Sequence, residues 1–374
     1  MQKNLGLYIH IPFCLSKCAY CDFYSLPIDG ELSKAYTNKI LGELNRWGGI
    51  LKCPPADTLY FGGGTPTLLN SEQIIAIINK SKELFSLKNA EITLEANPTE
   101  NLLEYFCAVA SAGVNRLSIG LQSANENELK LLSRRHTAND VIRCVDDARS
   151  AGIKNISLDI MLGIPGQTKQ SLKKTIDFAL SREPWHISAY LLSVEKGTLL
   201  YKNRDSLNIP NDDEAGELYL YATELLKSAG FERYEISNFA KDGNISKHNT
   251  KYWQGDDYLG LGPAAHSFVN GKRFYYNRDI NAYLSGPVET PDGEGGTAEE
   301  TLMLKLRLTS GLDLTEFKND FSGEITENII NRILKKAGFF KNCGLVIIKN
   351  NKISLTDEGA LVSNAIITEF AELL

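Results

Sequence analysis

Short apolar runs alternate with polar stretches of helical periodicity from residue 7 to about residue 240. The apolar runs predict seven strands: Leu7–Ile11, Thr58–Phe61, Glu91–Glu95, Arg116–Gly120, Ile156–Met161, Ile187–Leu192 and Tyr234–Ser237. The stretches between them predict helices, among them Ser71–Phe85, Thr99–Ser111, Ala138–Ser150 and Thr168–Ser181. Such alternation predicts an α/β fold with a parallel sheet and helical crossovers. A full or partial (β/α) barrel is favoured over a doubly wound sheet, because polar residues gather at the carboxyl ends of the strands.

The pattern changes after residue 285. Residues 286–296 read GPVETPDGEGG, and this density of glycine, proline and acid predicts a linker. Beyond it the pattern predicts three helices, a hairpin and a last helix: Glu299–Leu308, Leu314–Phe321, Thr326–Ala337, Leu345–Ile348 with Lys352–Leu355, and a helix from Asp357. These elements resemble a small winged-helix module. We therefore expect three parts: a barrel core over 1–240, a connecting segment over 241–296, and a C-terminal winged-helix-like domain over 297–374.

Composition is that of an ordinary globular protein. The 374 residues are 43% hydrophobic and 23% charged. A net charge of −6 argues against binding to nucleic acid, because proteins that bind its backbone are usually basic. The N-terminal segment lacks the apolar core of a signal peptide, and no run approaches the roughly 18 apolar residues of a spanning helix. We expect a cytoplasmic protein, whose reducing surroundings would suit its seven cysteines.

Three cysteines follow the first predicted strand at intervals of four and three residues. Cys14, Cys18 and Cys21 lie in the segment LYIHIPFCLSKCAYCDFYS. Thiolates on one loop are the usual ligands of iron–sulfur clusters, and a four-iron cluster held by three thiolates leaves one iron open to another ligand. A zinc site completed by His10, or a disulfide, is the alternative. The other cysteines are scattered and are expected to be inert thiols: Cys53, Cys107, Cys144 and Cys343.

Glycines and polar residues mark the ends of several predicted strands. Gly62–Gly64 omits three successive side chains, so the backbone can approach a ligand closely or adopt positive φ. Glu95, Gln122 and Asp159 lie in or at the end of later strands, and Arg134 lies in the loop LLSRRH. One such residue is usually a hydrogen-bonded core group. Four of them in matching positions predict a shared pocket.

These motifs resemble a known family. The segments YIHIPFCxxxCxxC, FGGGTPT, LEANP, SIGLQS, RRH and DxxxGxPGQT are similar to those of the radical S-adenosylmethionine (SAM) family of oxygen-independent coproporphyrinogen III oxidases and their relatives. The resemblance implies a partial barrel of the radical SAM type and a [4Fe–4S] cluster on the three cysteines, with the amino and carboxylate groups of SAM on the fourth iron. It also implies SAM contacts by the following residues: Tyr8, Tyr20, Gly63, Gly64, Thr65, Glu95, Gln122, Arg134 and Asp159.

The chain departs from the oxidase in its cysteine motif. The oxidase has a fourth cysteine where this chain has Phe23. Residues 248–253, HNTKYW, instead resemble the HNxxYW motif of the family's haem chaperone branch, whose members are thought to bind haem and deliver it to acceptor proteins. The resemblance therefore implies haem as a further cofactor, with His248 as its axial ligand. It also implies haem-accepting proteins as partners, which could bring the chain into peripheral contact with a membrane. The alternative is the oxidase, which decarboxylates coproporphyrinogen III through a 5′-deoxyadenosyl radical.

One further motif is set aside. Residues 260–265, GLGPAA, match the dinucleotide-binding fingerprint GxGxxA. The fingerprint requires a strand before the turn and a helix after it. The preceding run is too short for that strand, and Pro263 stands inside the turn. We do not assign a dinucleotide site.

Overall fold

Six parallel strands in the order of the chain form the centre of the molecule. The computed structural model describes residues 4–98 and 101–374. Its parallel strands are β1 (Leu5–Ile11), β2 (Ala56–Gly63), β3 (Glu91–Ala96), β4 (Arg116–Gln122), β5 (Asn155–Leu162) and β6 (His186–Leu191). Each strand pairs in parallel with the next along the chain. A doubly wound sheet would reverse its strand order partway. The consecutive order is that of a partial (β/α) barrel, and the predicted fold class is confirmed.

Further strands extend both edges of this sheet. Beyond β6 lie β8 (Asn238–Ala240) and β7 (Glu232–Arg233). Beyond β1 lie β9 (Tyr258–Leu261), β10 (His266–Val269), β11 (Lys272–Tyr275) and β12 (Thr290–Glu294). The strand β9 leads into another strand and not into a helix, which agrees with the rejection of the dinucleotide fingerprint.

Two of the predicted elements in this region are wrong. Residues 234–237 form the turn between β7 and β8, because the chain reverses there to pair antiparallel with itself. The predicted linker over 286–296 contains β12, which pairs with β11 at the edge of the sheet. Proline and glycine are tolerated there because an edge strand has a neighbour on only one side.

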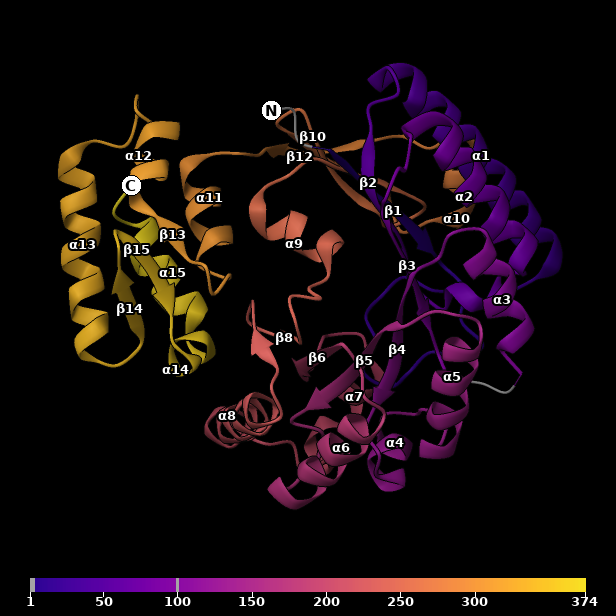
Figure 1. Cartoon of the computed structure of the whole chain (residues 1–374), viewed down its shortest axis with the longest axis horizontal. Coiled ribbons are helices and arrows are strands. Elements are labelled where there is room, and N and C mark those ends of the chain that lie inside the picture. The colour runs from indigo at the N-terminus through magenta and orange to yellow at the C-terminus, as the bar shows by residue number, and fades with distance from the viewer. Residues whose placement is uncertain (1–3, 99–100) are drawn as a thin grey trace.

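Helices cover the outer face of the parallel strands (Figure 1). They are α1 (Gly30–Leu51), α2 (Ser71–Phe85), α3 (Leu103–Ser111), α5 (Ala138–Ser150), α6 (Lys169–Ser181) and α8 (Asp212–Ser228). The short helices α4 (Glu126–Leu131), α7 (Leu199–Asn203) and α10 (Ile280–Ser285) lie in connections. Among the described residues, none of the helices combines the length and the apolar character that crossing a bilayer requires.

The predicted helices agree with the observed ones because their start signals are local. Capping boxes at Asn70 and Thr137 begin α2 and α5 at the predicted residues. Thr168 caps α6 and does not belong to it. The prediction over 99–111 begins in residues 99–100, which lie outside the described residues, and the observed helix starts at Leu103.

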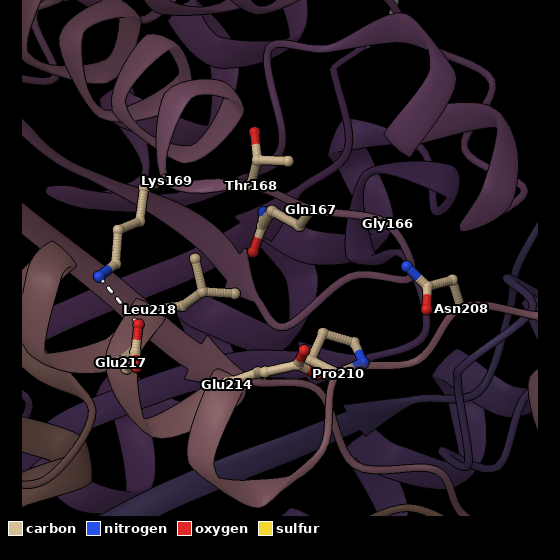
Figure 2. Close-up of a pocket in the computed structure, with 9 residues that line it drawn as sticks. All are labelled: Gly166, Gln167, Thr168, Lys169, Asn208, Pro210, Glu214, Glu217 and Leu218. Atoms are coloured by element: carbon tan, nitrogen blue, oxygen red, sulfur yellow. Dashed lines mark ion pairs between the residues drawn. The ribbon is translucent and has the colours of Figure 1, made fainter.

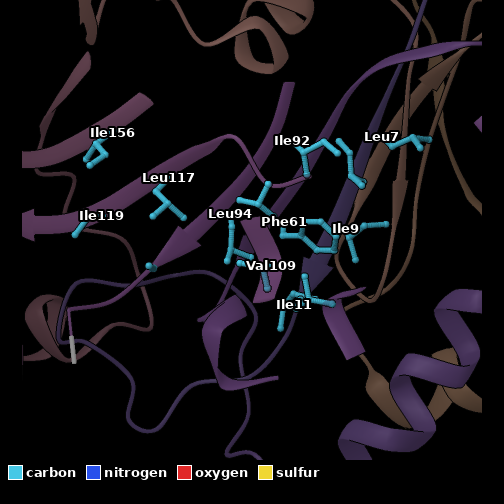
Figure 3. Packing of buried hydrophobic residues seen from close by; sticks show 14 of the residues in the cluster. Leu7, Ile9, Ile11, Phe61, Ile92, Leu94, Val109, Leu117, Ile119 and Ile156 are labelled. Carbon is cyan, nitrogen blue, oxygen red and sulfur yellow. The ribbon is translucent and has the colours of Figure 1, made fainter. Parts of the chain in front are cut away.

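An apolar core fills the space between the sheet and these helices. Leu7, Ile9 and Ile11 of β1 are fully buried with Phe61 of β2 and Leu94 of β3 (Figure 3). Successive side chains of a strand point to opposite faces of its sheet. The alternate positions on the same strands therefore face the interior of the barrel, and many of them are polar.

The C-terminal residues have a core of their own. Three strands, β13 (Leu312–Asp313), β15 (Lys352–Leu355) and β14 (Val346–Lys349), form a separate sheet. The helices packed with it are α11 (Ala298–Lys305), α12 (Leu314–Asp320), α13 (Glu327–Asn342), α14 (Asp357–Leu361) and α15 (Ser363–Ala371). The predicted helices and hairpin are present, and β13 is too short for a sequence pattern to show. Arg233 Nε of β7 ties this part to the barrel by donating to Asp357 Oδ1 over 2.9 Å.

Candidate functional site

A cavity of about 530 Å³ opens at the carboxyl ends of the parallel strands. The residues predicted to share a pocket, Glu95, Gln122, Arg134 and Asp159, all line it. The cluster loop, residues 14–21, forms another part of the wall with all three of its cysteines. The other predicted SAM contacts that line the cavity are Tyr20, Gly63, Gly64 and Thr65.

The cluster loop is held at both ends by backbone hydrogen bonds. Cys14 N donates to Leu26 O over 2.9 Å, and Ala19 N donates to Leu132 O over 3.1 Å. Cys14, Cys18 and Cys21 are half-buried, and all seven cysteines are free, so the disulfide alternative is not observed. Burial raises the pKa of Cys21. Three unpaired thiols therefore face one cavity.

The donor set fits an iron–sulfur cluster better than zinc. Within residues 4–98 and 101–374, no three His, Cys, Asp or Glu side chains converge on one point that a single ion could occupy. A four-iron cluster does not need such convergence, because each thiolate binds a different iron. His10, the fourth ligand of the zinc alternative, lies in β1 and uses both ring nitrogens. Its Nδ1 accepts from Tyr8 OH over 3.0 Å, and its Nε2 donates to Tyr24 O over 3.1 Å.

Glu95 and Asp159 place two carboxyl groups on the inner face of the barrel. Glu95 accepts hydrogen bonds from Tyr60 OH over 2.8 Å and from Gly63 N over 3.2 Å. Burial raises the pKa of Glu95 to about 7, and the negative charge of Asp159 adds to the rise. Asp159 accepts from Ser118 Oγ over 3.1 Å, and burial raises its pKa as well. These acceptors suit a ligand that carries hydroxyl and ammonium donors, as SAM does.

Arg134 connects the cluster loop to the strand ends. Its Nη1 donates to Cys18 Sγ over 3.5 Å, which places positive charge beside a prospective anionic ligand. Its Nη2 donates to Asn97 Oδ1 over 2.7 Å and to Gly120 O over 2.9 Å. A Cβ at Gly120 would lie 2.7 Å from that Nη2, so a larger residue there would displace the guanidinium of Arg134. Asn97 Nδ2 in turn donates to Thr65 Oγ1 over 2.7 Å and extends the network across the cavity wall.

The glycines at the end of β2 pack closely against other parts of the protein. A Cβ at Gly63 would lie 2.5 Å from the ring of His10, and one at Gly64 would lie 2.4 Å from Phe13 O. Gly63 also has a φ of +106°, in the region that favours glycine. The backbone at these glycines is therefore in close contact with β1 and the loop after it, and both glycines also line the cavity. A larger residue at Gly63 would displace His10, so its effect would report on packing.

Two predicted contact residues do not line the cavity. Tyr8 uses its hydroxyl on His10, as described above. His248 lies on α9 (Lys247–Gln254), which packs against β2 and α11 between the sheet and the C-terminal part (Figure 1). His248 is only 1% exposed, and its ring stacks on Tyr60 with centroids 5.2 Å apart.

Both ring nitrogens of His248 are already engaged. Nδ1 lies 2.8 Å from Thr58 Oγ1, and Nε2 lies 2.8 Å from Tyr252 OH. Burial lowers the pKa of His248 to about 3, so the ring is neutral. The expectation that His248 ligates haem iron does not fit this arrangement, because no ring nitrogen is free for an axial bond. The structure places it as a buried packing residue.

Other residues of the cavity wall were missed by the sequence analysis. They are Asn97, Arg116, Ser118, Ser188, Tyr190 and Asn249. The period of two along each strand could have indicated Ser118, which lies two residues before Gly120 on the same face. Asn249 lies in the HNxxYW motif, but the spacing of the motif does not show that Asn249, and not His248, lines the cavity.

A separate pocket of about 380 Å³ lies where α6 and α8 begin (Figure 2). It contains Gly166, Gln167 and Thr168 of the PGQT motif. Lys169 and Glu217 on its rim form an ion pair of 2.9 Å. The motif residues thus lie where α6 and α8 begin, and none of them lines the cavity that contains the cysteines.

Comparison with known proteins agrees with the fold. The radical SAM superfamily model matches residues 8–179, and the HemN C-terminal domain model matches residues 297–362. The chain is 33% identical to Heme chaperone HemW of Bacillus subtilis over 97% of this chain and 98% of that protein. It is 32% identical to Heme chaperone HemW of Mycobacterium tuberculosis over 98% of this chain and 94% of that protein.

A solved structure is also similar over the whole chain. Coproporphyrinogen III oxidase HemN from Escherichia coli, described as a radical SAM enzyme, has a TM-score of 0.84 at 22% identity. The match covers 100% of this chain and 91% of that one. At this identity the likeness shows the shared fold alone.

Proposed function

Because the chain belongs to the HemW family of radical SAM proteins, we propose that it is a haem chaperone that carries a [4Fe–4S] cluster and binds SAM. The observation that carries the proposal is the cavity at the strand ends, which is lined by three free thiols and by two half-buried carboxyl groups. The relatives that match the whole chain are named heme chaperones, which supports haem delivery as the task of this site.

Cys14, Cys18 and Cys21 would hold the cluster. SAM would occupy the cavity, with Glu95 and Asp159 accepting hydrogen bonds from its hydroxyl or amino groups. When bound, a reduced cluster supplies the electron that can cleave SAM. The chain's own residues enclose the ligand and keep acceptors in place, since each acid is already oriented by hydroxyl or amide donors.

We place haem at the mouth of this cavity. Phe23, Tyr190 and Leu191 line it and are 63%, 41% and 40% exposed. Exposed apolar groups beside a cavity are typical of binding surfaces, and aromatic rings can cover a porphyrin face. Phe23 also occupies the position at which the oxidase has its fourth cysteine. Phe23 thus supports the proposed haem contact, and the absence of a cysteine at its position argues against oxidase activity.

One preparation can test both functions. The full chain is reconstituted anaerobically with iron and sulfide, titrated with haem in the presence and absence of SAM, and assayed with coproporphyrinogen III, SAM and a reductant. We expect a saturable Soret change, transfer of haem to an apo-globin, and no protoporphyrinogen. Phe23→Ser should weaken haem binding, whereas Leu199→Ser, a matched change of an exposed residue outside the lining, should not.

Two results would contradict the proposal. Repeated turnover of coproporphyrinogen III would establish the oxidase instead. Haem binding that is absent, or that responds equally to the two variants, would remove the cavity mouth as the haem site.

A further inference from the structure

A chain of hydrogen bonds leads from the cavity to the start of α9. Asp159 of β5 lines the cavity, and Ser157, two residues earlier, lies on the same face of the strand. Ser157 Oγ lies 3.4 Å from Asp159 Oδ1 and 2.7 Å from Nδ1 of His186, its register partner on β6. The other ring nitrogen of His186, Nε2, lies 2.8 Å from Tyr234 OH. Tyr234 OH in turn accepts from the backbone N of Ser246, the N-cap of α9, over 3.2 Å.

The donors in this chain all point toward Asp159. Tyr234 OH accepts from the N-cap residue of α9, and within residues 4–98 and 101–374 its only other partner is His186, so its own proton goes to Nε2. Burial lowers the pKa of His186 well below its usual value, so the ring is neutral and carries its proton on Nδ1. That proton goes to Ser157 Oγ, which leaves the Ser157 hydroxyl proton for another acceptor. Asp159 and Ser188 lie within reach at 3.4 and 3.5 Å, and a carboxylate is the stronger acceptor.

The chain supplies Asp159 with a further side-chain donor. Ser118 Oγ already donates to Asp159 from β4 over 3.1 Å. A donor from Ser157 stabilises the ionised carboxylate and fixes the rotation of its plane, so that its remaining lone pairs keep one direction. Hydrogen bonds in a chain polarise one another, which strengthens the last of them. The bond of 3.4 Å is long, as is common in ligand-free sites, and such bonds shorten when the ligand binds.

The same chain connects Asp159 to α9 and to the C-terminal part. Ser246 caps α9, and Asn249, three residues later, lines the cavity together with Asp159. The backbone O of Tyr234 accepts from Thr309 N over 3.0 Å, and Thr309 lies between α11 and β13. A neutral histidine suits the centre of this chain, because one ring nitrogen accepts while the other donates. The first turn of α9 and the acceptor in the cavity therefore share one hydrogen-bonded frame.

We propose that His186 is a positioning residue for ligand binding, which acts through Ser157 to hold Asp159 as a hydrogen-bond acceptor in the cavity. The ligand group that Asp159 receives is a hydroxyl, because the amino and carboxylate groups of SAM are expected on the open iron. This choice of ligand rests on the proposed function, whereas the orientation of Asp159 by His186 does not.

A double-mutant cycle between Ser157 and Asp159 tests the chain without a ligand. Ser157→Ala, Asp159→Asn and the double variant of the full chain are unfolded with urea at pH 5 and pH 8. Burial raises the pKa of Asp159 above its usual value, and loss of the Ser157 donor raises it further. A raised pKa removes stability as the pH rises, so Ser157→Ala should cost more at pH 8 than at pH 5. In the Asp159→Asn background the cost should be the same at both pH values.

A control separates this effect from the loss of any buried hydroxyl. Ser267→Ala removes a buried hydroxyl of β10 that is hydrogen-bonded to Gly260. Its cost should be the same at both pH values, with or without Asp159. The other charged or titratable groups that face Asp159 are unchanged in every variant: Tyr20, Tyr60, Glu95, Arg116, Arg134 and Tyr190. The part of the pH dependence that Asp159→Asn abolishes is therefore due to Asp159.

The same variants, loaded with the cluster, measure the effect on SAM by calorimetry. Ser157→Ala should weaken SAM binding about fivefold, as loss of one hydrogen bond predicts, and should change it less than about twofold in the Asp159→Asn background. His186→Leu should match Ser157→Ala. His186→Asn, whose amide can donate in place of Nδ1, should recover most of the affinity. Melting temperatures identify any His186 variant that fails to fold, and Ser157→Ala then decides alone.

Additive effects of Ser157→Ala and Asp159→Asn on both stability and SAM affinity would overturn the proposal. A pH-dependent coupling in stability together with additive losses of SAM affinity would limit His186 to a structural role and overturn its part in ligand binding. Absence of SAM binding in the unaltered, cluster-loaded protein would contradict the proposed function, and the urea cycle would then decide whether His186 orients Asp159.

Discussion

His248 offers the sharpest test of the structure, because the sequence motif and the tertiary contacts assign it different roles. Replacement by alanine removes the hydrogen bonds to Thr58 Oγ1 and Tyr252 OH, each 2.8 Å long. It also removes a ring that is 1% exposed and stacked on Tyr60. If the residue serves packing, the change must reduce stability whether or not haem is present.

The magnitude follows from the groups left behind. A buried hydroxyl without a partner costs about 1–3 kcal/mol. Deletion of most of a buried ring leaves a cavity, which lowers the free energy of unfolding further. The half-buried Tyr252 can rotate its hydroxyl to water and so recover part of the lost hydrogen-bond energy. We expect His248→Ala to lower the free energy of unfolding by about 3 kcal/mol near neutral pH.

The pH dependence gives a second, independent signature. The pKa of His248 is lowered from 6.5 to about 3 in the folded protein by burial. Below pH 6.5 the unfolded chain therefore binds a proton that the folded chain does not. The stability due to His248 is complete above that pH and is lost as the pH falls toward 3. At pH 5 the unaltered protein has lost about 2 kcal/mol of this stability. The difference in the free energy of unfolding between the unaltered protein and His248→Ala should therefore shrink to about 1 kcal/mol at that pH.

Urea unfolding at pH 7.5 and pH 5 measures both quantities. His266→Ala is the control, because its side chain is 59% exposed and its loss should change stability by less than about 0.5 kcal/mol. A His248→Ala protein as stable as the unaltered chain, but with a displaced Soret band of the haem complex, would refute this argument. It would return His248 to the role of haem ligand.

Three further predictions concern the cluster, the acids and the contact between the two parts of the molecule. Replacing the three cysteines of the cluster loop by serine should abolish iron retention after anaerobic reconstitution, whereas replacing the other four should not; iron analysis of both variants decides this. The pKa of Glu95 is raised from 4.5 to about 7, so between these pH values the folded state holds a proton that the unfolded state releases. The stability of the unaltered protein should therefore fall as the pH rises through this range, and Glu95→Gln should remove that fall. The gain over the unaltered protein at pH 8 should be at most roughly 3 kcal/mol, and equal pH profiles in urea unfolding would contradict the assignment. Asp357→Asn should leave Arg233, whose side chain is 5% exposed, without its ion-pair partner and cost about 1–3 kcal/mol; limited proteolysis of the C-terminal part should accelerate, and unchanged cleavage would show that other contacts hold it.

Local patterns in the sequence determined most of the fold. The first residues of α2 and α5 were predicted correctly, because the capping box before each helix acts through residues three positions apart. The strands were found because each is a short apolar run between polar stretches, as parallel strands buried on both faces are. The shared cavity of Glu95, Gln122 and Asp159 could be predicted as well, since the carboxyl ends of consecutive parallel strands meet at one edge of the sheet.

Contacts between distant segments were decided only by the tertiary structure. The edge strand β12 has the composition of a linker and becomes a strand because β11 supplies a hydrogen-bonding partner. His248 and Asn249 are neighbours in one motif, and nothing in their spacing says which of them meets the cavity. Successive residues of a helix point about 100° apart, so the packing of α9 against β2 buries the imidazole and turns the amide inward. Arg116 likewise belongs to an ordinary strand pattern, and only the packing of the strands around it shows that this cation is 1% exposed.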